Sequence, residues 1–183
     1  MTSNPAPPYR PTPCYNQFQV DIARINVQLA TTDDFHRQLY YSNVVSIMEK
    51  YLYDLYIGEV TSCDNAFKEM CKLPKFAMQK YPLQEILYQD IKAKVINSVK
   101  NMVWHRLNDL DPIFKKTFNI KMNISQALKH ALEERHHFVH RNGFDLEGRA
   151  VVLTNADVSN AILLITDFIK DIDIKFHTYL YSK

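Results

Sequence analysis

The stretch that decides the fold lies near the carboxyl end, where residues 157–180 read DVSNAILLITDFIKDIDIKFHTYL. Its large apolar residues recur at alternating steps of four and three, which is the spacing of one face of an α-helix. These residues are Val158, Ile162, Ile165, Ile169, Ile172, Phe176 and Tyr179. An unbroken stripe of this length predicts a long helix that packs against another helix.

Several upstream segments show the same helical spacing, and the whole chain has only three glycines. The predicted helices cover 32–58 with Thr32 or Asp33 as the cap, 63–72, the residues from Pro82 to Met102, and a segment that begins at Asn123 or Ser125 and stops at Gly143. The sequence therefore predicts an all-α fold, a helical bundle of four to five main helices.

The amino-terminal residues 1–31 read differently from the rest. Five prolines fall within the first thirteen residues, and proline does not support the interior of a helix. Apolar residues then alternate with polar ones, which is the period of a half-buried strand. The alternating residues are Phe18, Val20, Ile22, Ile25, Val27 and Leu29. We expect 1–31 to be an extended or disordered arm with room for one short strand, followed by a single helical domain over 32–183.

The bulk composition narrows the function classes. With 183 residues, 46% of them apolar, the chain can bury one sizeable core, and its net charge of +2 indicates no general affinity for polyanions. Three cysteines without a CxxC spacing favour a reduced, cytoplasmic protein. The longest apolar run, Ala161 to Ile165, is far shorter than the roughly 20 residues that span a bilayer, so we expect no membrane partner.

Residues 131–149, ALEERHHFVHRNGFDLEGR, hold the candidate functional residues. Arg135 lies on the apolar side of the predicted helix, three or four residues, or about one helical turn, from most members of its apolar stripe. That stripe is Ile124, Leu128, Ala131, Leu132, Phe138 and Val139. A buried, unpaired guanidinium costs several kcal/mol or more. Arg135 is therefore expected either to meet a carboxylate such as Glu49 or to open onto a wet cleft.

Three histidines follow the arginine within five residues. Each has an ordinary structural interpretation and a chemical one. His136 and His140 are four residues apart, so their rings can approach one another on one helix face. His137 is expected at the solvated rim, and His140 also suits a helix carboxyl terminus as a capping cation. A titrating imidazole beside a permanent cation suits acid and base chemistry on a phosphodiester. RNA carries its own 2′-hydroxyl nucleophile, so such chemistry needs no metal.

A metal site is the competing chemical interpretation of the same cluster. Glu133-x-x-His136 matches the Glu-x-x-His element of di-metal helical bundles. Such a site needs a second copy of that element on another helix, whereas the second match, Glu134 to His137, lies on the same helix. Arg135 would repel a cation between them. We therefore expect neither a metal nor another cofactor.

The segment RHHFVH, from Arg135 to His140, resembles the R-x4-H motif of HEPN domains, which carry a polar residue after the arginine, here His136. The continuation from Arg141 to Gly148 resembles the HRNG…G extension of the RiboL-PSP or MAE_28990-like subgroup.

The opening helix of that subgroup resembles YYSNVVSIMEKYLYDLY, residues 40–56, including its glutamate, here Glu49. The resemblance covers about residues 33–180. It implies an all-α domain that forms a symmetric homodimer, with both motifs facing a shared cleft. Many members are metal-independent endoribonucleases of toxin or antiphage-defence systems.

The resemblance also implies roles for individual residues. Arg135 would bind the scissile phosphate, His140 would act as general acid or base, and His136 would assist, with Glu49, Arg141 and Asn142 in support. Some members have an antitoxin partner that modifies a tyrosine two residues after the motif histidine, and this chain has Asn142 there. The intact motif favours an endoribonuclease that acts on RNA. The alternative is a catalytically inactive domain that binds RNA or nucleotides or mediates dimerisation.

Overall fold

A computed structural model describes residues 7–30 and 32–182. Every regular element in these ranges is an α-helix, and one isolated antiparallel bridge joins Phe144 to Ala150. The predicted all-α fold is confirmed. Within the same ranges, no helix combines the length and the apolar character that crossing a membrane requires.

Contacts between residues divide the chain into two compact units. The first joins the residues up to Tyr51 with those from Asn123 onward, and the second holds Leu52–Met122. The helix α2 (Asp34–Ser62) runs through the boundary between them. A compact unit is not necessarily a domain, so one domain over 32–183 stays a prediction.

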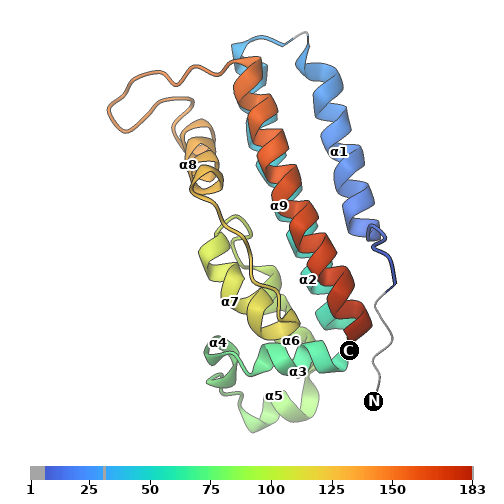
Figure 1. Cartoon of the computed structure of the whole chain (residues 1–183). Coiled ribbons are helices and arrows are strands. Elements are labelled where there is room, and N and C mark those ends of the chain that lie inside the picture. The colour runs from blue at the N-terminus through green and yellow to red at the C-terminus, as the bar shows by residue number, and fades with distance from the viewer. Residues whose placement is uncertain (1–6, 31, 183) are drawn as a thin grey trace. The chain divides into compact units, whose positions relative to one another are not determined.

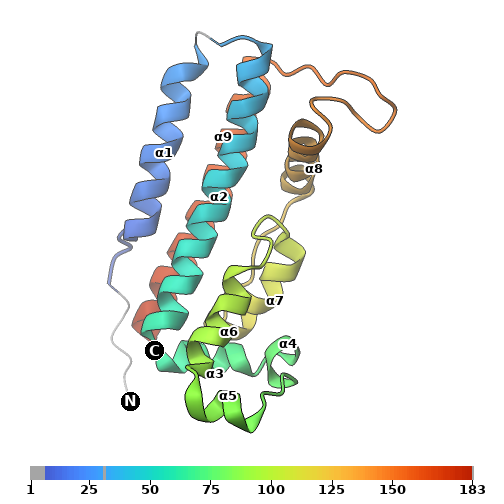
Figure 2. The same ribbon diagram turned by 180° about the vertical axis from the view of Figure 1, so that it is seen from behind.

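The first unit contains the long helices. Figures 1 and 2 show α1 (Pro13–Leu29), the first part of α2 and α9 (Asn155–Ser182) side by side, and α8 (Gln126–His140) contacts α9. The stripe predicted for α9 is confirmed, because its apolar members between Val158 and Phe176 are buried. Val44, Val45 and Met48, on the part of α2 that belongs to the same unit, are also fully buried. Burying an aliphatic side chain of this size contributes about 1.5–3 kcal/mol.

The second unit is built from the end of α2 and five shorter helices. These are α3 (Asp64–Cys71), α4 (Pro74–Ala77), α5 (Leu83–Tyr88), α6 (Ile91–Lys100) and α7 (Leu107–Phe118). Its core is aromatic, because the rings of Trp104, Phe114 and Phe118 all pack on Tyr56. The Tyr56 and Thr117 hydroxyls are joined by a hydrogen bond of 2.8 Å, which satisfies both polar groups inside this core.

The extended arm predicted for 1–31 is wrong for most of its length, because α1 is a helix from Pro13 to Leu29. Thr12 caps it by accepting the Tyr15 N–H at 3.1 Å, and proline suits the first helical position. Val20 and Val27, which the strand pattern required, are 49% and 75% exposed. The buried residues Phe18, Ile22, Ile25 and Leu29 follow steps of four, three and four. Residues 1–6 and 31 lie outside the described residues.

The long helix predicted after Pro82 is also wrong in part. It is divided into α5 and α6, and the Asp90 carboxylate caps α6 by accepting the Ala93 N–H at 3.0 Å. None of the residues of α5 is buried, so no continuous stripe holds the two helices in line. Elsewhere the predicted caps are confirmed: Asp33 accepts the His36 N–H at the start of α2, and Ser125 accepts the Leu128 N–H at the start of α8.

Candidate functional site

The candidate residues lie in the last two turns of α8 and in the turn that follows. Asn142 and Gly143 both adopt left-handed backbone angles, with φ of 52° and 85°, and the Gly143 N–H donates to the His137 carbonyl at 3.1 Å. A Cβ atom at Gly143 would lie 2.8 Å from the Gln38 amide oxygen. Gly143 is therefore confirmed as the helix stop, and Asn142 lies exposed beside it as the second left-handed residue.

Arg135 forms an ion pair with Glu49 of α2. The guanidinium Nη2 lies 3.9 Å from Glu49 Oε1, and the two side chains are 14% and 24% exposed. This separation is longer than a hydrogen bond, so the pair is held by charge rather than by a directed donor. The carboxylate partner that the sequence suggested is confirmed. Arg135 Nε, however, is buried and has no hydrogen-bond partner among the described residues, a state that costs about 1–3 kcal/mol.

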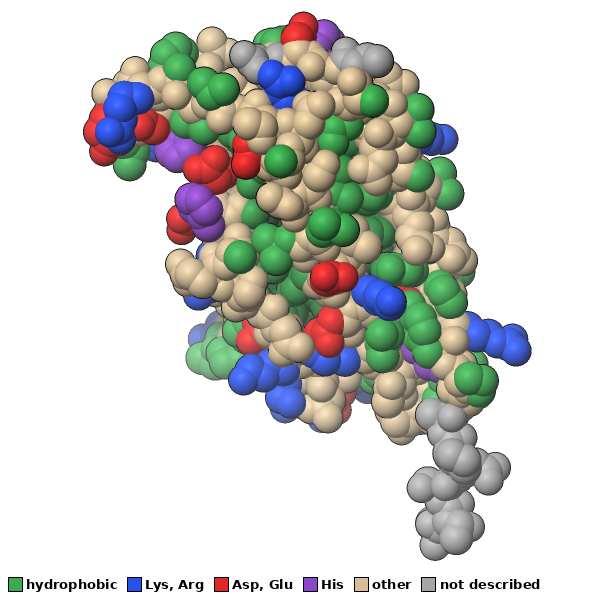
Figure 3. All heavy atoms as spheres, turned by 45° about the horizontal axis from the view of Figure 1, so that its top comes forward, with side chains coloured by type: hydrophobic (Ala, Val, Ile, Leu, Met, Phe, Trp, Pro, Cys, Tyr) green, Lys and Arg blue, Asp and Glu red, His purple; other side chains and the backbone are tan. Residues whose placement is uncertain are grey.

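His136 and His140 come together on the exposed side of α8. Their ring centroids are 4.5 Å apart with the planes tilted by 46°, and both residues are exposed. The approach predicted from their four-residue spacing is confirmed. Figure 3 shows histidine side chains beside carboxylates on the side of the molecule where α8 and the following loop lie.

Arg141 and His137 form a second pair at the helix end. Arg141 Nη1 lies 3.2 Å from His137 Nδ1, and because a guanidinium only donates, this ring nitrogen is the acceptor. The structure thus groups Arg135 with Glu49, His136 with His140, and Arg141 with His137. Since α8 stays helical through His140, Arg135 and His140 project about 140° apart around its axis.

The electrostatic setting of His136 favours its neutral form. Loss of solvent around the ring lowers the pKa of His136 below its ordinary value, and the nearby charges of His140 and Arg141 lower it further. A neutral imidazole at physiological pH can accept a proton. The pair therefore combines one ring suited to accept a proton with a second ring in contact with it.

We expect His140→Gln to raise the pKa of His136 towards its ordinary value, because the substitution removes a neighbouring positive charge. Titration of the His136 ring by NMR measures this directly. His130→Gln changes an exposed histidine nearly two turns earlier on α8 and should leave the His136 pKa in place. An unchanged His136 pKa in His140→Gln would show that the two rings are not electrically coupled.

Glu133 and His136 form the Glu-x-x-His element on which the competing metal interpretation depends. Among the side chains that the structure describes, no group of three or more histidine, cysteine, aspartate or glutamate residues is placed to hold a metal ion.

A cavity on another face of α8 was missed by the sequence reasoning. Tyr41, Glu134 and Asp157 line it. No local signal marks these residues. Tyr41 is one of several tyrosines of α2 and lies on its buried face, and Asp157 is an acidic residue in the first turn of α9, where it complements the helix dipole.

Comparison of the chain with protein-family models, with curated proteins and with solved structures gave no match, so the family resemblance of the R-x4-H segment remains a proposal.

Proposed function

We propose that this chain is a metal-independent endoribonuclease of the toxin or antiphage-defence type, acting in the cytoplasm. The observation that carries the proposal is the His136–His140 pair, two exposed imidazoles with ring centroids 4.5 Å apart at the end of α8. Acid and base catalysis near neutral pH needs one imidazole that accepts a proton and one that donates. The lowered pKa of His136 supports its assignment as the base, which leaves His140 as the acid.

The reaction follows from the chemistry of RNA. The 2′-oxygen attacks the adjacent phosphorus, and its proton passes to neutral His136. The bond from phosphorus to the 5′-oxygen breaks, and that oxygen takes a proton from His140. The products are a 2′,3′-cyclic phosphate and a 5′-hydroxyl, so neither water nor a metal enters this step.

Arginine supplies the charge that such a transition state needs. Arg135 is proposed to hold the scissile phosphate, because its 3.9 Å contact with Glu49 is loose enough for a phosphate to compete for the guanidinium. Arg141 lies one residue beyond His140 and adds a second cation at the helix end. A homodimer that brings two such helix ends to one cleft, and an antitoxin or defence-system partner, belong to the same proposal through the family resemblance.

A specific observation favours a second candidate, a catalytically inactive domain that binds RNA or nucleotides or mediates dimerisation. The Arg135 side chain is only 14% exposed and lies beside Glu49. It projects from α8 about 140° away from His140. An arginine held in this way stabilises the contact between α8 and α2 without meeting a substrate.

The test is cleavage of structured and unstructured RNA by the purified protein in excess EDTA. Fragments ending in 2′,3′-cyclic phosphate are expected from the parent chain, and His140→Ala should cut at least about a hundredfold more slowly, since a positioned acid or base contributes about 10²–10⁴ in rate. Arg135→Met should also lose cleavage, whereas Lys129→Met removes an exposed cation from the same helix and should retain it.

The outcomes separate the two candidates. RNA binding without cleavage by the parent chain supports the inactive module. Cleavage that persists equally in all three variants contradicts the assigned residues, and cleavage that EDTA abolishes contradicts the metal-free mechanism.

A further inference from the structure

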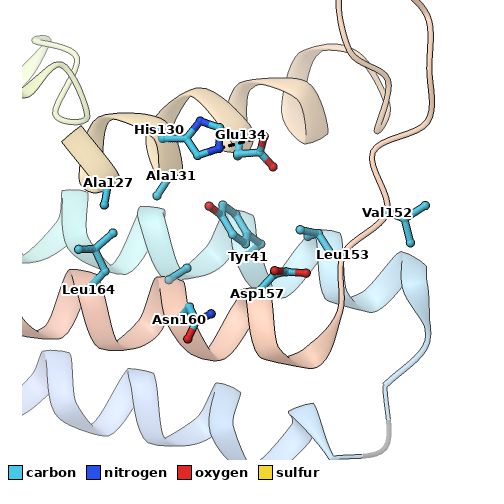
Figure 4. A pocket seen from close by; sticks show the side chains of 11 residues that line it. Tyr41, Ala127, His130, Ala131, Glu134, Val152, Leu153, Asp157, Asn160 and Leu164 are labelled. Atoms are coloured by element: carbon cyan, nitrogen blue, oxygen red, sulfur yellow. Dashed lines mark ion pairs between the residues drawn. The ribbon is translucent and has the colours of Figure 1, made fainter. Parts of the chain in front are cut away.

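A cavity of about 270 Å³ lies between α8, α9 and α2 within the first unit (Figure 4). It is somewhat smaller than the sites that hold drug-sized molecules, which measure about 300–1,000 Å³. Six of its eleven lining residues are aliphatic, and most of the others are polar. The aliphatic lining residues are Ala127, Ala131, Val152, Leu153, Ala161 and Leu164.

Two carboxylates enter this cavity from different helices, Glu134 from α8 and Asp157 from α9 (Figure 4). The Asp157 Oδ2 atom accepts hydrogen bonds from the Thr154 hydroxyl at 2.6 Å and from the Thr154 N–H at 2.7 Å. These two bonds lower the pKa of Asp157, so it is ionised at neutral pH while Oδ1 remains for a ligand. Glu134 Oε1 lies 3.8 Å from Nε2 of His130, whose side chain is 71% exposed and also lines the cavity.

Tyr41 provides an independent indication of a ligand. Tyr41 is only 5% exposed, and its ring packs on that of Phe138 at a centroid distance of 5.4 Å. It lines the cavity between Glu134 and Asp157 (Figure 4). The Tyr41 hydroxyl has no hydrogen-bond partner in the part of the chain that the structure describes. The hydroxyl is not sealed from the cavity, so a molecule within the cavity, either water or a ligand, supplies its partner.

The lining selects the charge and the shape of that partner. Burial raises the pKa of Tyr41, and the negative charges of Glu134 and Asp157 raise it further, so the hydroxyl stays neutral between two anions. An anionic ligand would be repelled. An ammonium group carries three donors around one compact charge, which matches acceptors arriving singly from three helices. The aliphatic wall then suits an alkyl chain.

We propose that this cavity binds a small aliphatic ammonium ligand, with Glu134 and Asp157 as the charge partners and Tyr41 as a hydrogen-bond partner. The site is separate from the His136–His140 pair and does not rest on the ribonuclease activity. The same ammonium chemistry is present in a free alkyl amine and in a lysine side chain, so the test includes both.

Binding is measured by NMR titration of the full chain at low ionic strength. Putrescine is the probe for a free amine, and Nα-acetyl-lysine methylamide is the probe for a lysine side chain. At least one is expected to bind with a Kd below about 1 mM, a modest affinity for so few ligand atoms. Butane-1,4-diol has nearly the shape of putrescine without its charges, and it should not bind. The proposal is overturned if neither amine binds, or if the diol binds as well as putrescine.

Substitutions locate the site. Glu134→Gln and Tyr41→Phe keep the side-chain shape and should each weaken amine binding, the former by about tenfold or more because a charge-assisted hydrogen bond is lost. Glu133→Gln makes the same charge change at the adjacent, exposed position outside the cavity and should leave the Kd unchanged. Equal weakening by Glu133→Gln and Glu134→Gln would assign the binding to general surface charge. Circular dichroism of each variant confirms that it is folded.

Discussion

Replacing Asp173 with alanine is expected to lower the free energy of unfolding by about 4 kcal/mol, because it removes the acceptor of four buried or partly buried donors. Asp173 lies in α9 and is fully buried. Its carboxylate accepts from the Tyr9 hydroxyl at 2.9 Å, from the Thr12 N–H at 3.1 Å and hydroxyl at 2.5 Å, and from the Tyr51 hydroxyl at 2.8 Å.

The loss should fall first on the docking of α1. Thr12 is the cap of α1, and the carboxylate of Asp173 ties that cap to α9, while Tyr51 brings α2 to the same point. Burial, together with the Asp173 carboxylate, raises the pKa of Tyr51, so its hydroxyl remains a donor over the whole physiological range. Amide hydrogen exchange in α1 should therefore accelerate more than exchange elsewhere in the first unit.

Urea unfolding followed by circular dichroism measures the effect of Asp173→Ala. Asp167→Ala provides the matched control, because Asp167 is an exposed aspartate on the same helix and its loss should change stability by less than about 0.5 kcal/mol. Equal stability losses in the two variants would show that the four contacts to Asp173 contribute nothing beyond helix propensity.

The second large effect is expected in the aromatic core of the second unit. Phe114→Ala should reduce the free energy of unfolding by about 4 kcal/mol, since a buried phenylalanine truncated to alanine typically costs 3–5 kcal/mol through lost burial and a residual cavity. Phe114 is fully buried and its ring centroid lies 5.1 Å from that of Tyr56 and 5.6 Å from that of Phe118.

The single tryptophan of the chain reports on this unit. Trp104 packs on Tyr56 in the same aromatic cluster, so its fluorescence during urea unfolding follows the loss of that core. Phe35→Ala is the same substitution at a residue that is 64% exposed and should cost less than about 1 kcal/mol. A stability loss in Phe114→Ala no larger than in Phe35→Ala would mean that the cluster collapses around the missing ring.

The sequence alone determined the features that depend on neighbouring residues. The steps of four and three in α9 are set by the helix repeat, and the caps at Asp33 and Ser125 and the stop at Gly143 are set by local hydrogen bonds and backbone angles. The same local geometry predicted that His136 and His140 would meet. The helix repeat also placed Arg135 on the apolar side of α8. Glu49 was the carboxylate suggested as its partner.

Tertiary structure decided the amino-terminal helix. The apolar residues from Phe18 to Leu29 satisfy the period of a strand and of a helix at once, so local spacing does not choose between them. In the structure, Thr12 caps α1 and is bound by Asp173, which lies 161 residues away. Nothing near Asp173 in the sequence distinguishes it from the exposed aspartates of the same helix.

The cavity beside α8 depends on tertiary structure for the same reason. Tyr41, Glu134 and Asp157 lie on three helices that are distant along the chain, and each has an ordinary local role. The packing of α8 against α9 brings the two carboxylates to the same cavity that Tyr41 lines. Helix periods and caps arise from contacts within a few residues, whereas a shared hydrogen-bond acceptor or a ligand cavity arises only where distant helices meet.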